Sequence, residues 1–152
     1  MSRIRWSVAV VLVCAVGLAG CSKTAATTSE IGGDPAVVTP IPGAGDRHRI
    51  QLTPDAARRI GLQTGTVREG NFGPTGSARK LAVAISAVLY DHAGTTWVYG
   101  QTAPLTFQRM PVIISRVAGD DYVLKSGPAA GTAVATVGVA ELRGSEDGVP
   151  GE

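Results

Sequence analysis

The sequence predicts a mainly β protein, whose folded part is a small antiparallel β-barrel or sandwich-like domain with one short N-terminal helix. Short apolar segments recur along the chain at the spacing of an all-β domain. Twenty glycines and nine prolines separate these segments, as expected for residues that mark turns. One stretch, residues 53–61, carries both the start and the stop signals of a helix. With 152 residues, the chain is long enough for one such domain.

The chain begins with the features of an export signal, which we assign to residues 1–20. Arg3 and Arg5 precede an apolar run from Val8 to Leu18, in the order found in a signal helix. The run of about 11 residues is shorter than the ~20 that a membrane-spanning helix needs. The sequence therefore predicts a cleaved signal and not a permanent transmembrane segment.

Small residues close this segment and end in a cysteine: Leu18, Ala19, Gly20 and Cys21. They resemble a bacterial lipoprotein box, which implies cleavage in this region and a diacylglyceryl group on Cys21. Two acyl chains give stable anchoring, whereas one gives only marginal binding. We therefore expect Cys21 to bind the protein to membrane lipid on the extracytoplasmic side of the cell membrane. The alternative is an ordinary secretory signal in which Cys21 is incidental.

Residues 21–46 are rich in Ser, Thr, Ala, Gly and Pro and show no apolar periodicity. Such a segment cannot bury enough surface to offset the entropy lost on ordering. The composition predicts a flexible tether that holds the following domain close to the membrane.

The folded domain is predicted over residues 47–143, and it begins with a strand and a short helix. Arg49–Leu52 has strand character, and the next residues contain helix-start chemistry. Thr53 offers an N-cap hydroxyl and Pro54 suits the first helical position. Gly61 can take the left-handed conformation that ends a helix.

The rest of the domain is predicted to be extended segments joined by turns. The expected strands are Leu62–Val67, Leu81–Ile85, Val88–Tyr90, Thr95–Tyr99, Leu105–Val117, Tyr122–Leu124 and Ala133–Val139. The Gly-rich stretch Gly70–Ser77 is expected to be a loop. Pro111 marks an edge or a bulge within its strand, because proline cannot donate to a ladder. Residues 144–152 are predicted to be a frayed acidic tail.

Composition and motifs point away from catalysis and from nucleic acid. Loss of the signal removes Arg3 and Arg5, which takes the formal charge from +2 to zero, so a nucleic-acid partner is not expected. The folded part has no cysteine, and a zinc site would need both His48 and His92 with carboxylates. The chain has no nucleophile elbow, phosphate loop or dinucleotide-binding motif. We expect a protein that is not an enzyme and has no metal or cofactor.

Two segments resemble a known family, the periplasmic adaptor subunits of efflux systems (membrane fusion proteins). Ile50–Val67 resembles the entry into the adaptor core, and Ala82–Val139 resembles the C-terminal membrane-proximal domain. The second match rests on Ala87-Val88-Leu89-Tyr90-Asp91, Gly94, Trp97-Val98-Tyr99, Phe107-Gln108-Arg109, Gly119-Asp120 and Gly131-Thr132. In the family these segments pair with each other, which implies that they form one closed unit here.

The chain also departs from the family. Full-length adaptors place a β-barrel, a lipoyl-like domain and a helical hairpin between the two segments. Here Glu69–Lys80 takes their place, and about 10 residues close a turn but cannot build a helical hairpin. Because the hairpin docks onto the outer-membrane channel, that role is not expected for this chain.

These observations lead to one expectation with two alternatives. We expect a lipid-anchored, non-catalytic accessory or adaptor module of an efflux system, docked to an integral membrane transporter subunit. Trp97, Arg109 and Arg116 are candidate partner contacts. For Trp97 a core position is favoured over an exposed one, and solvated strand faces explain the two arginines equally well. The alternatives are a small-molecule-binding lipoprotein for uptake or sensing, and a cell-envelope protein without a transport role.

Overall fold

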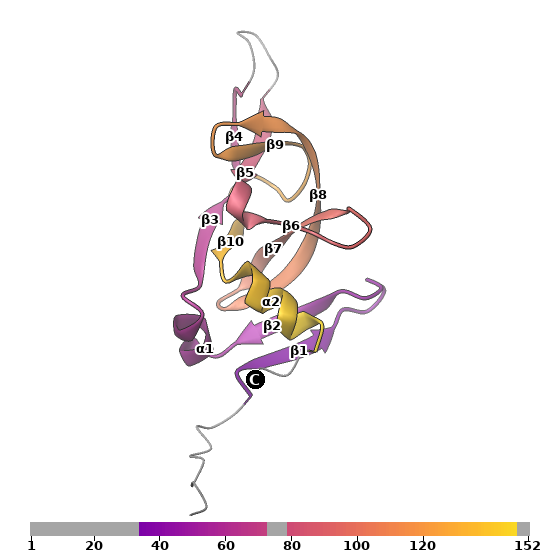
Figure 1. Ribbon diagram of the computed structural model, residues 1–152, viewed down its shortest axis with the longest axis vertical. Helices are drawn as coiled ribbons and strands as arrows, with labels where there is room; N and C mark the ends of the chain where they lie inside the picture. Colours follow the sequence, from indigo (N-terminus) through magenta and orange to yellow (C-terminus); the bar gives the residue numbers. More distant parts are fainter. Residues whose placement is uncertain (1–33, 73–78, 149–152) are drawn as a thin grey trace, which may run out of the picture. The chain divides into compact units, whose positions relative to one another are not determined.

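Strands make up most of the described chain, which covers residues 34–72 and 79–148 of the computed structural model (Figure 1). The strands are β1 (Ala36–Pro40), β2 (His48–Leu52), β3 (Gln63–Thr66), β4 (Arg68–Gly70), β5 (Lys80–Ala84), β6 (Val88–Tyr90), β7 (Thr96–Ala103), β8 (Thr106–Ala118), β9 (Asp121–Ser126) and β10 (Ala133–Val137). The helices are α1 (Pro54–Arg59), the 3-10 turn η1 (Ile85–Ala87) and α2 (Val139–Glu146). None of the helices in the described ranges has the length and apolar character needed to cross a bilayer.

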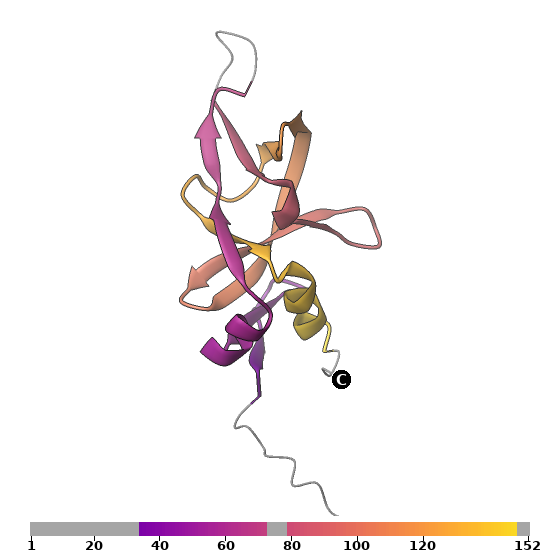
Figure 2. The same ribbon diagram turned by 60° about the vertical axis from the view of Figure 1, so that its left-hand side comes forward.

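The strands join into one antiparallel sheet, in the order β3-β10-β7-β8-β9-β5-β4. Strand β2 joins β1 to β8, and β6 pairs with β7. The sheet is nearly closed and barrel-like, which confirms the predicted fold class. Figures 1 and 2 show α1, α2 and the β1–β2 pair at one end of this unit, with β4, β5 and β9 at the other.

The long strand β8 runs between the two ends and changes partner on the way. Its first residues pair with β2, where Phe107 lies opposite Ile50. Its last residues pair with β9, where Val117 lies opposite Tyr122. Pro111 pairs with Trp97 of β7 in the stretch between these two ladders. The expected edge position of Pro111 is thus confirmed, because neither β2 nor β9 is paired with β8 there.

Helix α1 forms as its capping residues predict. The Thr53 hydroxyl accepts a hydrogen bond from the Ala56 amide at 3.1 Å, and Pro54 is the first helical residue. Gly61 has a φ of +62°, a left-handed conformation that suits glycine. The helix buries Ala56 and Ala57 and leaves its arginines exposed.

The two segments that resemble the adaptor family fold against each other. Strand β2 of the first segment pairs with β8 of the second, and β3 pairs with β10. Between the segments, β4 and β5 pair with Gly70 opposite Lys80. In the chain, β4 and β5 are separated by residues 71–79. Residues 73–78 of the predicted loop lie outside the described residues.

Two groups of buried side chains fill the unit. One comprises Ile50, Leu52, Ala56, Ala57, Tyr99, Phe107, Ala135 and Leu142. The other comprises Val67, Val83, Ala87, Val98, Val112, Leu124 and Val134. Tyr99 and Phe107 are the largest fully buried side chains, and small aliphatic residues supply most of the remainder. Large-to-small changes in such a packed core leave cavities that the neighbours cannot fill.

The prediction of a tether up to residue 46 is wrong for its last part. Residues Ala36–Pro40 form β1, which pairs with β2 over five residue pairs. Val37 and Val38 remain exposed, so backbone pairing and not apolar burial accounts for this strand. Gly43 and Gly45 take positive φ values in the connection that returns the chain to β2. Residues 1–33, which include the signal, Cys21 and the start of the tether, lie outside the described residues.

The prediction of a frayed tail from residue 144 is also wrong for its first residues. Helix α2 continues to Glu146, and Leu142 and Glu146 are both buried. The acidic residue that indicated a solvated tail has a specific partner inside the fold, described below. Residues 149–152 lie outside the described residues.

Candidate functional site

The three predicted contact residues do not form one surface. Trp97 is partly buried, and the Arg109 side chain is only 3% exposed. Arg116 is exposed on the part of β8 that pairs with β9. The structure therefore removes Arg109 as a partner contact and leaves Arg116 accessible. The reason is the buried polar network around Arg109, which sequence patterning did not indicate.

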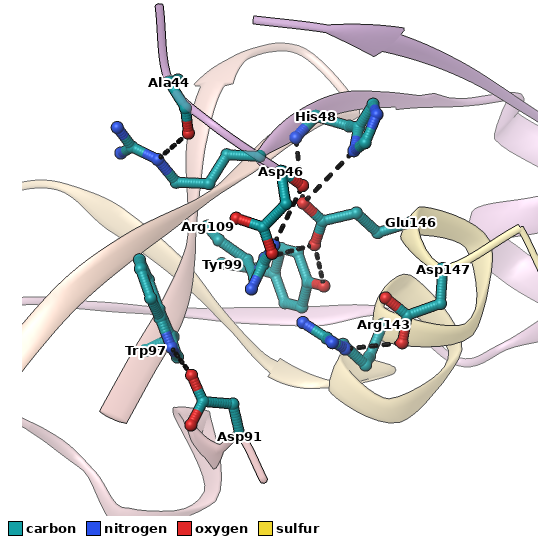
Figure 3. A network of polar contacts seen from close by, with 11 residues as sticks. Ala44, Asp46, His48, Asp91, Trp97, Tyr99, Arg109, Arg143, Glu146 and Asp147 are labelled. Carbon is teal, nitrogen blue, oxygen red and sulfur yellow. Dashed lines mark hydrogen bonds and ion pairs between the residues drawn. The ribbon is translucent and has the colours of Figure 1, made fainter. Parts of the chain in front are cut away.

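Arg109 lies at the centre of this network (Figure 3). Its Nε lies 2.7 Å from Glu146 Oε2, and both side chains are almost fully buried. Its Nη2 donates to the backbone carbonyl and the carboxylate of Asp46, at 3.1 and 3.0 Å. The guanidinium carbon stands 5.1 Å from the centre of the Trp97 ring, within the range of a cation–π contact. The buried cation is thus compensated from three directions.

Glu146 connects α2 to three other parts of the fold (Figure 3). Besides contacting Arg109 on β8, its carboxylate accepts a hydrogen bond from the Tyr99 hydroxyl on β7 at 2.7 Å. It also accepts one from the His48 amide at the start of β2 at 2.9 Å. A buried carboxylate is tolerated when it is paired and hydrogen-bonded in this way. We interpret the network as a clamp that holds α2 on the sheet.

The network shifts the pKa values of several of its members, among them Asp46 and Tyr99. Hydrogen bonding to Arg109 lowers the pKa of the Asp46 carboxyl. Burial and the hydrogen bond to Glu146 raise the pKa of Tyr99 well above its usual range. In the folded protein, Tyr99 therefore stays a neutral donor at pH values where an unfolded tyrosine ionises.

This difference predicts a loss of stability in alkaline solution. Below about pH 10, Tyr99 is protonated in both states and contributes no pH dependence. Above about pH 10, the unfolded chain releases the Tyr99 proton while the folded chain keeps it. The free energy of unfolding then falls by up to ~1.4 kcal/mol per pH unit. Urea titrations of the wild type and Tyr99→Phe from pH 8 to 11 measure this, with the steeper fall expected in the wild type. Equal slopes would contradict the assignment.

The described residues hold no cluster of metal-ligating side chains. Both oxygens of the Glu146 carboxylate are already occupied by donors within the fold. Within residues 34–72 and 79–148, no three His, Cys, Asp or Glu side chains come together as metal ligands do. The chemistry that the network supports is structural.

A second feature is an exposed apolar surface, which we call the tyrosine patch (Ile85, Tyr90, Val117 and Tyr122). Tyr90 is 59% exposed and Val117 is 56% exposed. The hydroxyls of Tyr90 and Tyr122 are 3.0 Å apart, and Val117 lies opposite Tyr122 in the β8–β9 ladder. The Ile85 amide bonds to the Asp120 carbonyl next to this ladder. Exposed aromatic and aliphatic side chains of this kind are typical of the centres of protein interfaces.

Comparisons with protein-family models, curated proteins and solved structures found no match to this chain. A function for this chain is therefore inferred from its strand pairing, its exposed surface and the resemblance noted in the sequence. The tyrosine patch could have been suspected from Tyr90 and Tyr122, which border predicted turns. Nothing in the local sequence marks Glu146 as buried.

Proposed function

We propose that this protein is a lipid-anchored, non-catalytic accessory or adaptor module of a membrane transport system of the efflux type. It would act by protein–protein docking at the outer face of the cytoplasmic membrane. The anchor in this proposal is Cys21, which follows Leu18, Ala19 and Gly20 at the end of the export signal. The docking module is the β domain that follows.

The observation that carries the proposal is the pairing of the two adaptor-like segments. Ladders β2–β8 and β3–β10 join them into one unit, and the β4–β5 connection closes the chain between them. This is the arrangement that the resemblance to a membrane-proximal domain implies. The pairing supports a module that consists of a membrane-proximal-like domain. Such a module would lack the helical hairpin with which adaptors reach an outer-membrane channel.

A lipid anchor makes weak docking effective. Confinement to the membrane raises the local concentration of the module near an integral partner. An interface of low affinity is then still largely bound. The tyrosine patch is the surface we assign to the extracytoplasmic part of a transporter. Arg116 directly precedes Val117 on β8, and successive side chains of a strand point to opposite faces, so Arg116 is a separate accessible contact outside the patch.

The anchor is tested by changing Cys21 to alanine in the full chain. We expect the variant to leave the membrane fraction, because it has no site for the acyl chains. Cys14→Ala is the matched control, since Cys14 lies within the signal and should not affect anchoring. A Cys21→Ala protein that stays with membranes after a high-salt wash would contradict the lipoprotein assignment.

The docking role is tested in the same strains by purification in mild detergent after chemical crosslinking. We expect a multi-pass transporter to co-purify with the wild type. The double variant Tyr90→Ala, Val117→Asp should no longer co-purify with it. Val37→Asp is the control, because Val37 is exposed on β1, away from the patch. Recovery of the wild type as a lone monomer at every expression level would contradict the adaptor role.

A further inference from the structure

We propose that a groove beside α1 rests on the anionic surface of the bilayer that holds Cys21. This inference rests on the proposed lipid anchor and deepens it, since it states which end of the domain faces the lipid. Four observations carry it: an open apolar groove, a strained leucine beside it, two exposed arginines, and the point where the chain from Cys21 joins the fold.

The first observation is the groove itself, which we call the α1 groove. It is lined by Pro54, Ala57, Arg58, Gly61, Leu62, Gln63 and Leu105. Its volume is about 520 Å³, its lining is mainly apolar, and it is open to the outside. An open, mainly apolar surface suits a shallow contact with a lipid interface better than it suits an enclosed small ligand.

The second observation is the backbone of Leu105. Among the described residues, Leu105 is the one non-glycine residue with a positive φ, at +52°. A leucine in this region is uncommon, and glycine would fit the turn more easily. The Leu105 carbonyl accepts a hydrogen bond from the Leu52 amide at 2.9 Å, which fixes the turn against β2. The strained turn therefore keeps an apolar side chain at the α1 groove.

The third observation is the charge beside the groove. Arg58 and Arg59 occupy the last turn of α1, and both are exposed. Arg58 forms an ion pair with Asp55, while no ion pair of Arg59 is found within the described residues. Arginine next to apolar side chains is the combination that binds anionic lipid surfaces.

The fourth observation is where the chain from Cys21 enters the fold. The Thr53 amide, at the N-cap of α1, donates to the carbonyl of Pro35 at 3.1 Å. Pro35 is 14 residues after Cys21, so the two are at most roughly 50 Å apart. An acylated Cys21 is therefore joined to the domain at its α1 end. The tyrosine patch lies on η1, β6, β8 and β9, away from this attachment point (Figure 1).

The experiment uses acylated full-length protein with a single added thiol that carries a fluorophore. The acylated mature chain has no other free thiol, because Cys14 is removed with the signal. Gln63→Cys places the label at the α1 groove, and Lys125→Cys places it on β9 as the matched control. Each protein is reconstituted into phosphatidylcholine vesicles with or without phosphatidylglycerol, with a quencher on the lipid headgroups. Mass spectrometry verifies the acyl chains first.

We expect headgroup quenching of the Gln63→Cys label, strongest with phosphatidylglycerol, and little quenching of the Lys125→Cys label. Arg58→Gln with Arg59→Gln should weaken the contact by roughly fivefold per arginine. The control pair Arg116→Gln and Lys125→Gln removes the same amount of charge from β8 and β9. It should leave the contact between the α1 groove and the lipid unchanged. Thermal unfolding checks that both pairs of changes keep the fold.

The outcomes separate this inference from the proposed function. Absence of acyl chains on Cys21 would refute the anchor. Acylated protein whose two labels are quenched equally would overturn the α1-groove inference and leave the anchor standing. Protection of the Gln63→Cys label in native membranes, but not in pure lipid, would assign the groove to a protein partner and also overturn it.

Discussion

Replacing Glu146 with alanine is expected to reduce the free energy of unfolding by about 3 kcal/mol or more. The change leaves Arg109 as a buried cation with Asp46 as its only carboxylate partner, and Asp46 is mostly exposed. It also removes the acceptor of the Tyr99 hydroxyl and of the His48 amide. For a domain whose total stability is typically about 5–15 kcal/mol, such a loss is large. Urea unfolding followed by tryptophan fluorescence measures it, because Trp97 stacks beside Arg109.

Glu141→Ala is the matched control for this prediction. Glu141 lies on the same helix but is exposed, so its removal should change stability by less than about 0.5 kcal/mol. Glu146→Gln keeps the size of the side chain and removes its charge, so its effect should lie between the two. Similar stabilities for Glu146→Ala and Glu141→Ala would show that the network does not hold α2.

Truncating Phe107 to alanine is expected to cost about 3–5 kcal/mol. Phe107 is fully buried on β8, pairs with Ile50 of β2 and Gln101 of β7, and belongs to the core group that includes Leu142. The cavity would therefore loosen the end of the unit where β1, β2 and the helices meet. Ile113→Ala on the same strand is the control, because Ile113 is 53% exposed. Equal losses in the two variants would contradict the assigned core.

Helices and hairpins whose capping or turn residues are close in sequence could be predicted from those residues alone. Thr53, Pro54 and Gly61 define both ends of α1 without reference to the rest of the fold. The turn at Asp91–Gly94 similarly predicts the β6–β7 hairpin, in which Asp91 accepts hydrogen bonds from the amides of Ala93 and Thr95. The expected strand Leu81–Ile85 is observed as β5, whose adjacent residues Ala82 and Val83 are both buried.

Elements that depend on distant partners were not predictable in this way. β1 lies in a stretch of linker-like composition, and only its pairing with β2 makes it a strand. α2 contains Gly144 and Ser145, which are weak helix formers, and it is held by Leu142 and Glu146. No local pattern distinguishes a solvated glutamate from one that meets an arginine on another strand.

Dependence on partners that are distant in sequence also explains why only part of the predicted contact residues are accessible. Trp97 is partly buried, next to the fully buried Val98 and Tyr99 of the same strand. Arg109 was expected either to contact a partner or to lie on a solvated strand face. Its burial follows from Glu146 and Asp46, which lie on other elements. Arg116 has no such partner among the described residues and stays accessible.

The link between His48 and Glu146 has a consequence for biogenesis. These residues are 98 positions apart, and a polypeptide is synthesised from its N-terminal side. The strands that carry Tyr99 and Arg109 are delivered before the acid that neutralises the guanidinium. Folding of this end of the domain must therefore wait until α2 has been synthesised. A product that ends before Glu146 would retain an uncompensated internal charge and would be a natural target for proteolytic quality control.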